Sequence, residues 1–344
     1  MPETPRDLGY RMPAEWSPHA ATWLAWPHNR EDWPGKFAPI AWVYCEIVKK
    51  LARVERVRIL VQNEDLEQDA RRKLKKVGAD LDAVQFFRQE TDRVWTRDYC
   101  PLFLKGPGGE VAVTNWRFNG WAKYDDWKRD NAVPAVLARK LKLRQWSPGL
   151  VLEGGSVDVN GAGLVLTTEE CLLSPVQARN PGLSRGQIEQ ALSEYLGADK
   201  VVWLGRGIAG DDTHGHVDDL ARFVSEDTVA LVSERDRSDA NYEPLRENLE
   251  ILRRHPLRVV KLPMPAPVVF NGQRLPASYA NFYIANKLVL VPTFNDPADR
   301  IALATLARCF PDREVAGIHA ADLVWGLGTL HCMTQQEPKA GVRC

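Results

Sequence analysis

Five segments of the chain each end in one or two polar side chains of types that take part in catalysis. They are Asp98, Glu153, His216 with Asp218, the patch Ser278-Tyr279-Asn281, and Cys332. The segments lie 53 to 63 residues apart, so their period is nearly constant. A period of this length is typical of an array of equivalent units. If such units surround a common centre, their strand ends converge there, and the carboxylates, the histidine and the thiol share one pocket.

Cys332 is the candidate nucleophile. It follows Gly326-Leu327-Gly328-Thr329, where glycine lets the backbone approach a ligand and leaves amide groups free to hold an anion. We therefore expect Gly328 to contact the substrate. The neighbouring residues, His331 among them, are polar, which is unusual around a thiol that only fills a core. Packing in the core is the alternative role for this cysteine.

His216 lies in the segment HGHVDDLARFV, residues 214–224. If this segment is a strand, His214, His216 and Asp218 point to one face, which pairs an imidazole with a carboxylate. A surface turn is the alternative. The pattern HxHxD also begins the metal site of some binuclear zinc hydrolases. Here, however, Asp219 stands where that pattern usually has another histidine, so a zinc hydrolase is the rival hypothesis.

Asp98 and Glu153 each follow an apolar run, where a buried carboxylate is costly without a cationic partner. Arg97 is the expected partner of Asp98, and an ordinary ion pair at a strand end is the alternative for either acid. Two glycines follow Glu153 and indicate close backbone approach. Trp95 offers a flat aromatic face beside Asp98, which suits a planar cation. The predicted pocket is acidic with one thiol, so its natural ligand is a guanidinium or amidinium.

The composition limits the possible partners. The chain has 344 residues, 44% hydrophobic and 26% charged, with a formal net charge of zero, so no overall field favours nucleic acid or an anionic membrane. The beginning of the chain has no signal-peptide pattern, and no run is long enough to span a bilayer, which favours a cytoplasmic location. The six scattered cysteines, including Cys344, form no CxxC pair and are expected to be reduced. A homodimer is the default assembly.

Alternating strand and helix patterns define the units. Predicted strands cover 57–62, 84–87, 111–116, 150–152, 163–168, 200–204, 228–233, 257–262, 287–293 and 313–318, and predicted helices cover 64–77, 129–142, 183–197, 240–255 and 296–310. A further strand at 21–27 could close a ring by pairing with the last unit, which would remove exposed sheet edges. No linker or low-complexity tract interrupts the series. We therefore expect one domain over residues 1–344.

Several motifs resemble those of the agmatine deiminases, which belong to the guanidine-modifying, or pentein, superfamily. They are WTRD, NWRFNGWAKYDDW, VLEGGS, VLTTEECLLS, HGHVDD, ASYANFYIAN and GTLHCMTQQ. The resemblance covers nearly the whole chain, with the motifs in the same order. It implies a five-bladed α/β propeller without metal or cofactor that hydrolyses agmatine, a small cationic guanidine, to N-carbamoylputrescine and ammonia. A peptidylarginine deiminase of the same superfamily and a non-catalytic polyamine-binding protein are alternatives.

The resemblance also implies a role for each motif residue. Cys332 corresponds to the nucleophile and His216 to the proton-transfer group. Glu153 corresponds to the carboxylate partner of that histidine, Asp98 and Asp218 to the acids that hold the guanidinium, and Trp95 to an aromatic contact. The chain departs from the family pattern at Gly326–Thr329, where three glycines and Asn are usual. It departs again at Asp212 and His214, where Glu and Asn are common and where the distal amine of agmatine could bind.

Overall fold

The computed structural model describes residues 3–341, and Cys344 lies outside this range. The described chain is a mixed α/β fold with five sheets of three or four strands and one short hairpin. The first sheet has the order β18-β1-β2-β3, with β18 at Gln335–Pro338, β1 at His19–Ala25, β2 at Arg56–Val61 and β3 at Val84–Arg88. The next two sheets are β4-β5-β6 (Leu102–Lys105, Val111–Thr114 and Arg144–Trp146) and β7-β8-β9 (Asp158–Val159, Leu164–Thr168 and Lys200–Leu204). The last two are β10-β11-β12 (Ala221–Ser225, Thr228–Ser233 and Arg258–Pro263) and β15-β16-β17 (Tyr283–Ala285, Leu288–Thr293 and Glu314–His319). The hairpin pairs β13 (Val269–Phe270) with β14 (Gln273–Arg274).

The same connection recurs in the four sheets that follow the first along the chain. An antiparallel pair is followed by a parallel third strand, and a helix makes the crossover that a parallel pair requires. The crossover helices are α4 (Lys128–Leu141), α6 (Arg185–Leu196), α7 (Tyr242–Leu252) and α8 (Pro297–Cys309). In the first sheet, α1 (Phe37–Leu51) and α2 (Glu64–Lys76) connect parallel strands. The predicted alternation of strand, helix and strand is confirmed, but the strand predicted at 150–152 is wrong. The chain pairs with β5 through β6 instead, and Val151 makes only an isolated bridge with Arg117.

Local signals explain where these helices begin and end. The Ser184 side chain accepts a hydrogen bond from the Gln187 backbone at the start of α6, in a capping box. The helix ends at Gly197, which has a φ of 73°, a backbone conformation that glycine adopts without strain. The boundaries predicted for α6 are therefore correct to within about two residues. The helix α4 continues through Pro134, which lies inside it.

The strand predicted at 21–27 has two neighbours. β1 pairs in parallel with β2 and antiparallel with β18. In the antiparallel pair, Thr22 of β1 lies opposite Gln336 of β18. The expected pairing with the last part of the chain is present, but its partner strand, Gln335–Pro338, has a polar sequence that did not indicate a strand. Segments from the two ends of the chain thus share one sheet.

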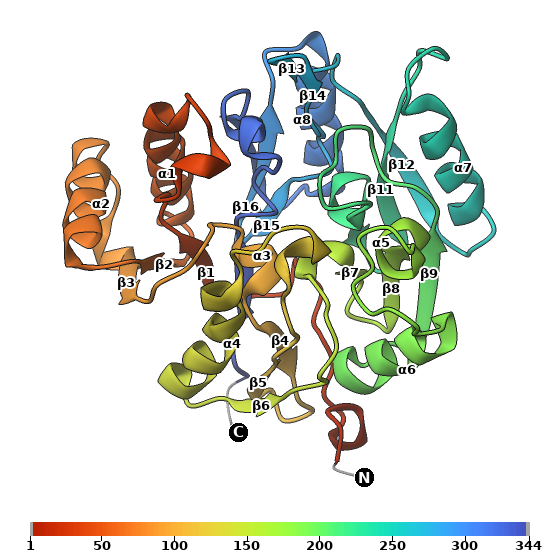
Figure 1. Cartoon of the computed structure of the whole chain (residues 1–344), viewed down its shortest axis with the longest axis horizontal. Helices are drawn as coiled ribbons and strands as arrows, with labels where there is room; N and C mark the ends of the chain where they lie inside the picture. The colour runs from red at the N-terminus through yellow and green to blue at the C-terminus, as the bar shows by residue number, and fades with distance from the viewer. Residues whose placement is uncertain (1–2, 342–344) are drawn as a thin grey trace.

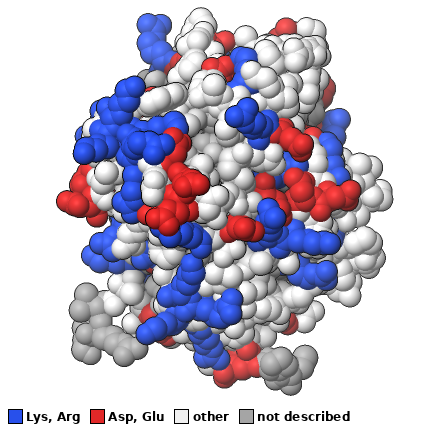
Figure 2. Space-filling model, turned by 60° about the vertical axis from the view of Figure 1, so that its left-hand side comes forward, with Lys and Arg blue, Asp and Glu red and all other residues white. Residues whose placement is uncertain are grey.

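The long helices α1, α2, α4, α6, α7 and α8 lie around the outside of the molecule, and β1, β4, β7 and β15 lie nearer its middle (Figure 1). A large cluster of buried apolar side chains includes Trp23, Ile59, Phe223 and Leu290, drawn from several sheets. On the face seen in Figure 2, acidic and basic side chains lie beside one another. Among the described residues, no helix has the length and apolarity needed to cross a bilayer.

Candidate active site

A cavity of about 440 Å³ lies at the ends of several of these units. Its lining combines acidic side chains, aromatic rings and one thiol. The lining residues are Glu31, Asp32, Arg93, Trp95, Asp98, Trp121, Tyr124, Asp125, Asp126, Asp212, Thr213, Gly326, Leu327, Gly328 and Cys332. A cavity of this volume is typical of a small-molecule site, and its many acidic side chains favour a cationic ligand.

Cys332 lies between the short helix Leu323–Gly326 and β18, and its side chain is buried. Its Sγ accepts a hydrogen bond from Asn281 Nδ2 at 3.0 Å and lies 3.8 Å from Asp218 Oδ2. Burial, followed by the charges of Asp218, Asp219 and Asp98, raises the pKa of the Cys332 thiol well above its usual value. The empty site therefore holds a neutral thiol, and a bound cation would favour its ionisation.

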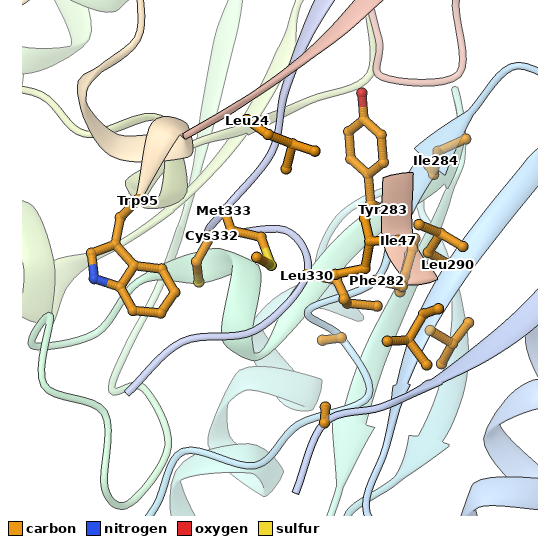
Figure 3. Close-up of a cluster of buried hydrophobic side chains, with 14 of the residues drawn as sticks. Leu24, Ile47, Trp95, Phe282, Tyr283, Ile284, Leu290, Leu330, Cys332 and Met333 are labelled. Atoms are coloured by element: carbon orange, nitrogen blue, oxygen red, sulfur yellow. The ribbon is translucent and has the colours of Figure 1, made fainter. Parts of the chain in front are cut away.

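Trp95 and Gly328 flank the thiol. Figure 3 shows the Trp95 ring on the side of Cys332 that faces away from the apolar core. A Cβ atom on Gly328 would lie 2.7 Å from the Trp95 ring and 3.1 Å from Cys332 Cβ, so a larger residue does not fit there. The absence of a side chain brings backbone, indole and sulfur together, as expected from the glycine-rich segment.

Asp98 belongs to the short helix α3 (Thr96–Tyr99). Its Oδ1 accepts the Gly155 backbone N–H at 3.1 Å, and its Oδ2 accepts Trp121 Nε1–H at 3.0 Å. Burial, with the nearby charges of Asp218 and Glu153, raises the pKa of Asp98 to about 7, although His216 opposes this shift. The expected partner, Arg97, pairs instead with Glu15 at 3.1 Å, so that prediction is wrong.

Glu153 is fully buried and holds its charge through Arg179, whose Nε donates to Glu153 Oε1 at 3.0 Å. Burial alone would raise the pKa of Glu153, but Arg179 and His216 lower it to about 2. The second oxygen, Oε2, makes no hydrogen bond and lies 3.6 Å from His216 Nε2. Glu153 is therefore an ionised carboxylate facing the imidazole at neutral pH.

His216 lies between two of the predicted acids. Its Nδ1 is 3.8 Å from Asp98 Oδ1, on the opposite side of the ring from Glu153. Burial would lower the pKa of His216, but Asp98, Cys171 and Glu153 outweigh it and raise this pKa well above its usual value. A Cβ atom on Gly155 would lie 2.5 Å from His216 Nδ1. This close approach explains why a glycine stands at position 155, two residues after Glu153.

The segment around His216 is not the predicted strand. His214 and Gly215 have φ values of 63° and 94°, and Val217–Asp219 forms a short 3-10 helix. This turn separates the two histidines, because His214 Nε2 lies 3.1 Å from Ser174 Oγ whereas His216 faces the acids of the cavity. The strand prediction, with His214 and His216 on one face, is wrong. Glycine at 215 permits a turn that alternation of residue types did not reveal.

Asp218 Oδ2 accepts a hydrogen bond from His331 Nδ1 at 2.6 Å, and Nε2 of the same ring lies 2.8 Å from Glu15 Oε2. The Glu15 carboxylate also forms ion pairs with the guanidinium groups of Arg97 and Arg222, at 3.1 and 3.0 Å. The Asp218 Oδ1 atom makes no hydrogen bond and lies 4.0 Å from His216 Nδ1. A buried charge network thus fixes one oxygen of Asp218 and leaves the other unpaired.

Asp212 lies at the cavity edge with both oxygens paired. Tyr124 OH donates to its Oδ2 at 2.6 Å, and Lys123 Nζ pairs with its Oδ1. The predicted residues Asp98, Glu153, His216, Asp218, Cys332, Trp95 and Gly328 are brought together, with Asp212 further out at the edge. His214 lies apart from them.

The structure adds neighbours that the sequence did not identify as site residues: Glu15, Trp121, Arg179, Asp219 and His331. Of the patch Ser278-Tyr279-Asn281, only Asn281 reaches the thiol. Asn281 also donates to Asp219 Oδ1 at 2.9 Å. The Tyr279 hydroxyl bonds to Asp299 instead. A polar residue directly before Cys332 was the only signal for His331 in the sequence.

The described residues include two buried groups of side chains with metal-ligand types, Glu153 with Cys171 and His216, and Asp218 with Asp219 and Cys332. Neither contains His214, on which the HxHxD interpretation depends. The five cysteines in this range are all unpaired.

Known proteins resemble this chain over almost its whole length. A family model described as Porphyromonas-type peptidyl-arginine deiminase matches residues 11–338. The agmatine deiminase of Pseudomonas putida is 37% identical over 97% of each chain. Two solved structures superpose closely on this chain. The agmatine deiminase of Enterococcus faecalis has a TM-score of 0.91 and 32% identity, with 98% of both chains covered. A cysteine-to-serine variant of the C. jejuni agmatine deiminase with substrate bound has a TM-score of 0.89 and 31% identity, with 96% of this chain and 97% of that chain covered. The chain belongs to the Porphyromonas-type peptidyl-arginine deiminase family.

Proposed function

We propose that the protein hydrolyses agmatine to N-carbamoylputrescine and ammonia, a step towards putrescine. One observation carries this proposal: a buried thiol lies beside two carboxylates, Asp98 and Asp218, and near an imidazole that contacts Glu153. The acids suit a flat guanidinium, and the thiol suits attack on its carbon. Relatives named agmatine deiminase, which align with nearly the entire chain, support the same substrate.

Asp98 and Asp218 are proposed to hold the guanidinium by charge-assisted hydrogen bonds and to place its carbon next to Cys332. Asp218 has one free oxygen for this purpose. Trp95 and the Gly328 backbone are proposed to confine the plane of the cation. The positive charge of the substrate offsets the acids that raise the pKa of Cys332, so binding favours loss of the thiol proton to solvent and leaves the thiolate.

In the first step, the Cys332 thiolate attacks the guanidinium carbon and a C–S bond forms. His216, protonated in the empty site because its pKa is raised, gives its proton to the departing nitrogen, the C–N bond breaks and ammonia leaves. In the second step, neutral His216, oriented by Glu153, takes a proton from water as the water oxygen attacks the same carbon. The C–S bond then breaks as the hydroxyl group of the adduct gives its proton to solvent, which releases N-carbamoylputrescine and regenerates the thiolate.

We further propose that the five sheets form a five-bladed α/β propeller and that residues 1–344 are one catalytic domain. The recurrent connection and the pairing of β1 with β18 support this arrangement. In the proposed chemistry, the side chains of the site act without a metal or cofactor. A cytoplasmic location, a homodimer and the absence of nucleic-acid or membrane partners stay predictions of the sequence.

The proposal is tested by ammonia release from three substrates: agmatine, free arginine and a peptide that contains arginine. Agmatine is expected to be the preferred substrate, with N-carbamoylputrescine identified by mass spectrometry. Preference for the peptide would favour a peptidylarginine deiminase instead. Loss of activity after chelation, restored by zinc, would favour the zinc hydrolase. Binding of agmatine without ammonia release would indicate a polyamine-binding protein.

Substitution of His331 by glutamine is expected to change the pH dependence of the reaction. Burial would raise the pKa of Asp218, but the hydrogen bond and charge of His331 lower it. Without His331 the pKa of Asp218 rises, so the ionised form that holds the substrate is lost at a higher pH. In the wild-type protein the acid limb of the kcat/KM profile is set by Asp98, whose pKa is about 7, because His331 keeps the pKa of Asp218 below this limb. In the variant Asp218 joins the limb, so we expect the limb to become steeper and to shift to higher pH.

A merely structural role for His331 would lower the activity equally across the pH range. An unshifted acid limb, in a variant whose circular dichroism matches the wild type, would contradict the assignment of His331 as a positioning residue.

A further inference from the structure

The segment that carries Trp121, Lys123 and Tyr124 has an unusual backbone. Gly120, Trp121 and Ala122 have φ values of 64°, 58° and 53°, so three successive residues are left-handed and two of them are not glycine. Such conformations are sparsely populated and persist only where the surroundings hold them. Here they direct the indole of Trp121 to Asp98, while Lys123 and Tyr124 reach Asp212.

The contacts of Asp212 join this segment to the turn before His216 across the cavity edge. Gln177 Nε2 strengthens the junction by donating to the backbone carbonyls of Trp121 and Asp212, both at 3.2 Å. Tyr124 supplies a neutral hydrogen bond to Asp212, whereas Lys123 supplies the positive charge. The carboxylate is therefore held by the hydroxyl and neutralised by the ammonium.

Two cations near the cavity edge differ in how firmly they are held. Arg93 pairs with Asp32 at 2.7 Å and Asp126 at 2.9 Å, lies 4.3 Å from the Tyr124 ring centre, and its side chain is 11% exposed. Lys123 makes one ion pair, with Asp212, lies 5.5 Å from the Tyr124 ring centre and is 41% exposed. An exposed, single ion pair is weak and easily exchanged, whereas a buried cation between two acids is not.

We infer that Lys123 is an exchangeable counter-ion, which occupies Asp212 in the empty site and yields it to the distal ammonium of the substrate. The inference rests on the proposed function and deepens it, because it names the chemical class that the site selects: a guanidine whose alkyl chain ends in a cation. While Lys123 is paired with Asp212, it neutralises the carboxylate. Lys123 thus weakens the attraction of this part of the cavity for a second cation.

The test compares two ligands of equal chain length, agmatine and the neutral-tailed butylguanidine. In Lys123→Met, the charge of Asp212 is no longer neutralised while the bond from Tyr124 stays. We expect KM for agmatine to fall about five-fold, the scale of an exposed ion pair, and KM for butylguanidine to change by less than about two-fold. Lys128→Met is the matched control, since Lys128 is exposed in the same region and has no contact with Asp212.

Binding to the Cys332→Ala background, measured by calorimetry, separates this inference from the proposed reaction. There the Lys123→Met change should raise the affinity for agmatine by a similar factor and leave butylguanidine nearly unaffected. Equal changes for both ligands, an equal effect of Lys128→Met, weaker agmatine binding, or no binding of either ligand would overturn the inference. Selective tightening without ammonia release from the wild type would overturn the proposed function and leave the role of Lys123 standing.

Discussion

Replacement of Cys332 by alanine is expected to reduce agmatine turnover at least about 10⁴-fold, because no other group in the cavity can form the covalent intermediate. The proposed guanidinium contacts come from Asp98 and Asp218, so agmatine binding should persist. Ammonia release measures the turnover, and calorimetry measures the binding. Retention of binding with loss of turnover is the signature of a nucleophile rather than of a residue that shapes the pocket.

Cys309→Ala is the control for this substitution. Cys309 ends α8, is half-buried and lies outside the cavity lining. Its removal should leave kcat and KM within about two-fold of the wild type, since a thiol away from the reacting atoms contributes only packing. Similar losses of turnover in both variants would count against Cys332 as the nucleophile.

Substitution of His216 by asparagine is expected to lower kcat by roughly 10²- to 10⁴-fold, the usual contribution of general acid–base catalysis. His216 serves both proposed steps, first as the acid for ammonia and then as the base for water, so both should slow. The raised pKa of His216 means that the proton for the first step is already in place at neutral pH. Rapid-quench mass spectrometry follows the covalent adduct, and steady-state ammonia release gives kcat.

The matched control is His214→Asn, two residues away. His214 faces Ser174, and its φ of 63° is a conformation that asparagine tolerates. We expect this variant to keep its kcat within about two-fold. A comparable loss in the two variants would show that the turn, rather than the His216 imidazole, determines the rate.

The sequence predicted the repeated units well because their signals are local. Alternating apolar runs marked β8 and β9, and Ser184 and Gly197 marked the ends of α6. Several elements were not predicted, and three of them show why. β18 is polar and becomes a strand only by pairing with β1, and the short β6 pairs with β5 although the more apolar segment 150–152 was expected to be the strand. Pairing between distant segments leaves no local signal. At Gly215 the glycine was a local turn signal, but the alternation of HGHVDD outweighed it in the prediction.

The acids, thiol and imidazole of the site were found because each closes a periodic unit. Their supporting partners could not be found in this way. Arg179 reaches Glu153 from a loop after α5 (Glu169–Leu173), and Glu15 reaches His331 from before β1. Their roles depend on which segments meet in space, so charge alone did not distinguish them from the many other acidic and basic residues of the chain.

The pairing of β1 with β18 has a consequence for how the protein is made. During synthesis β1 is made long before its antiparallel neighbour, Gln335–Pro338, which is the last strand of the described residues. Cys332 arrives just ahead of that strand. Contacts between such distant segments form late, so a nascent chain carries Asp98, Glu153 and Asp218 before Cys332 has been added to complete the site.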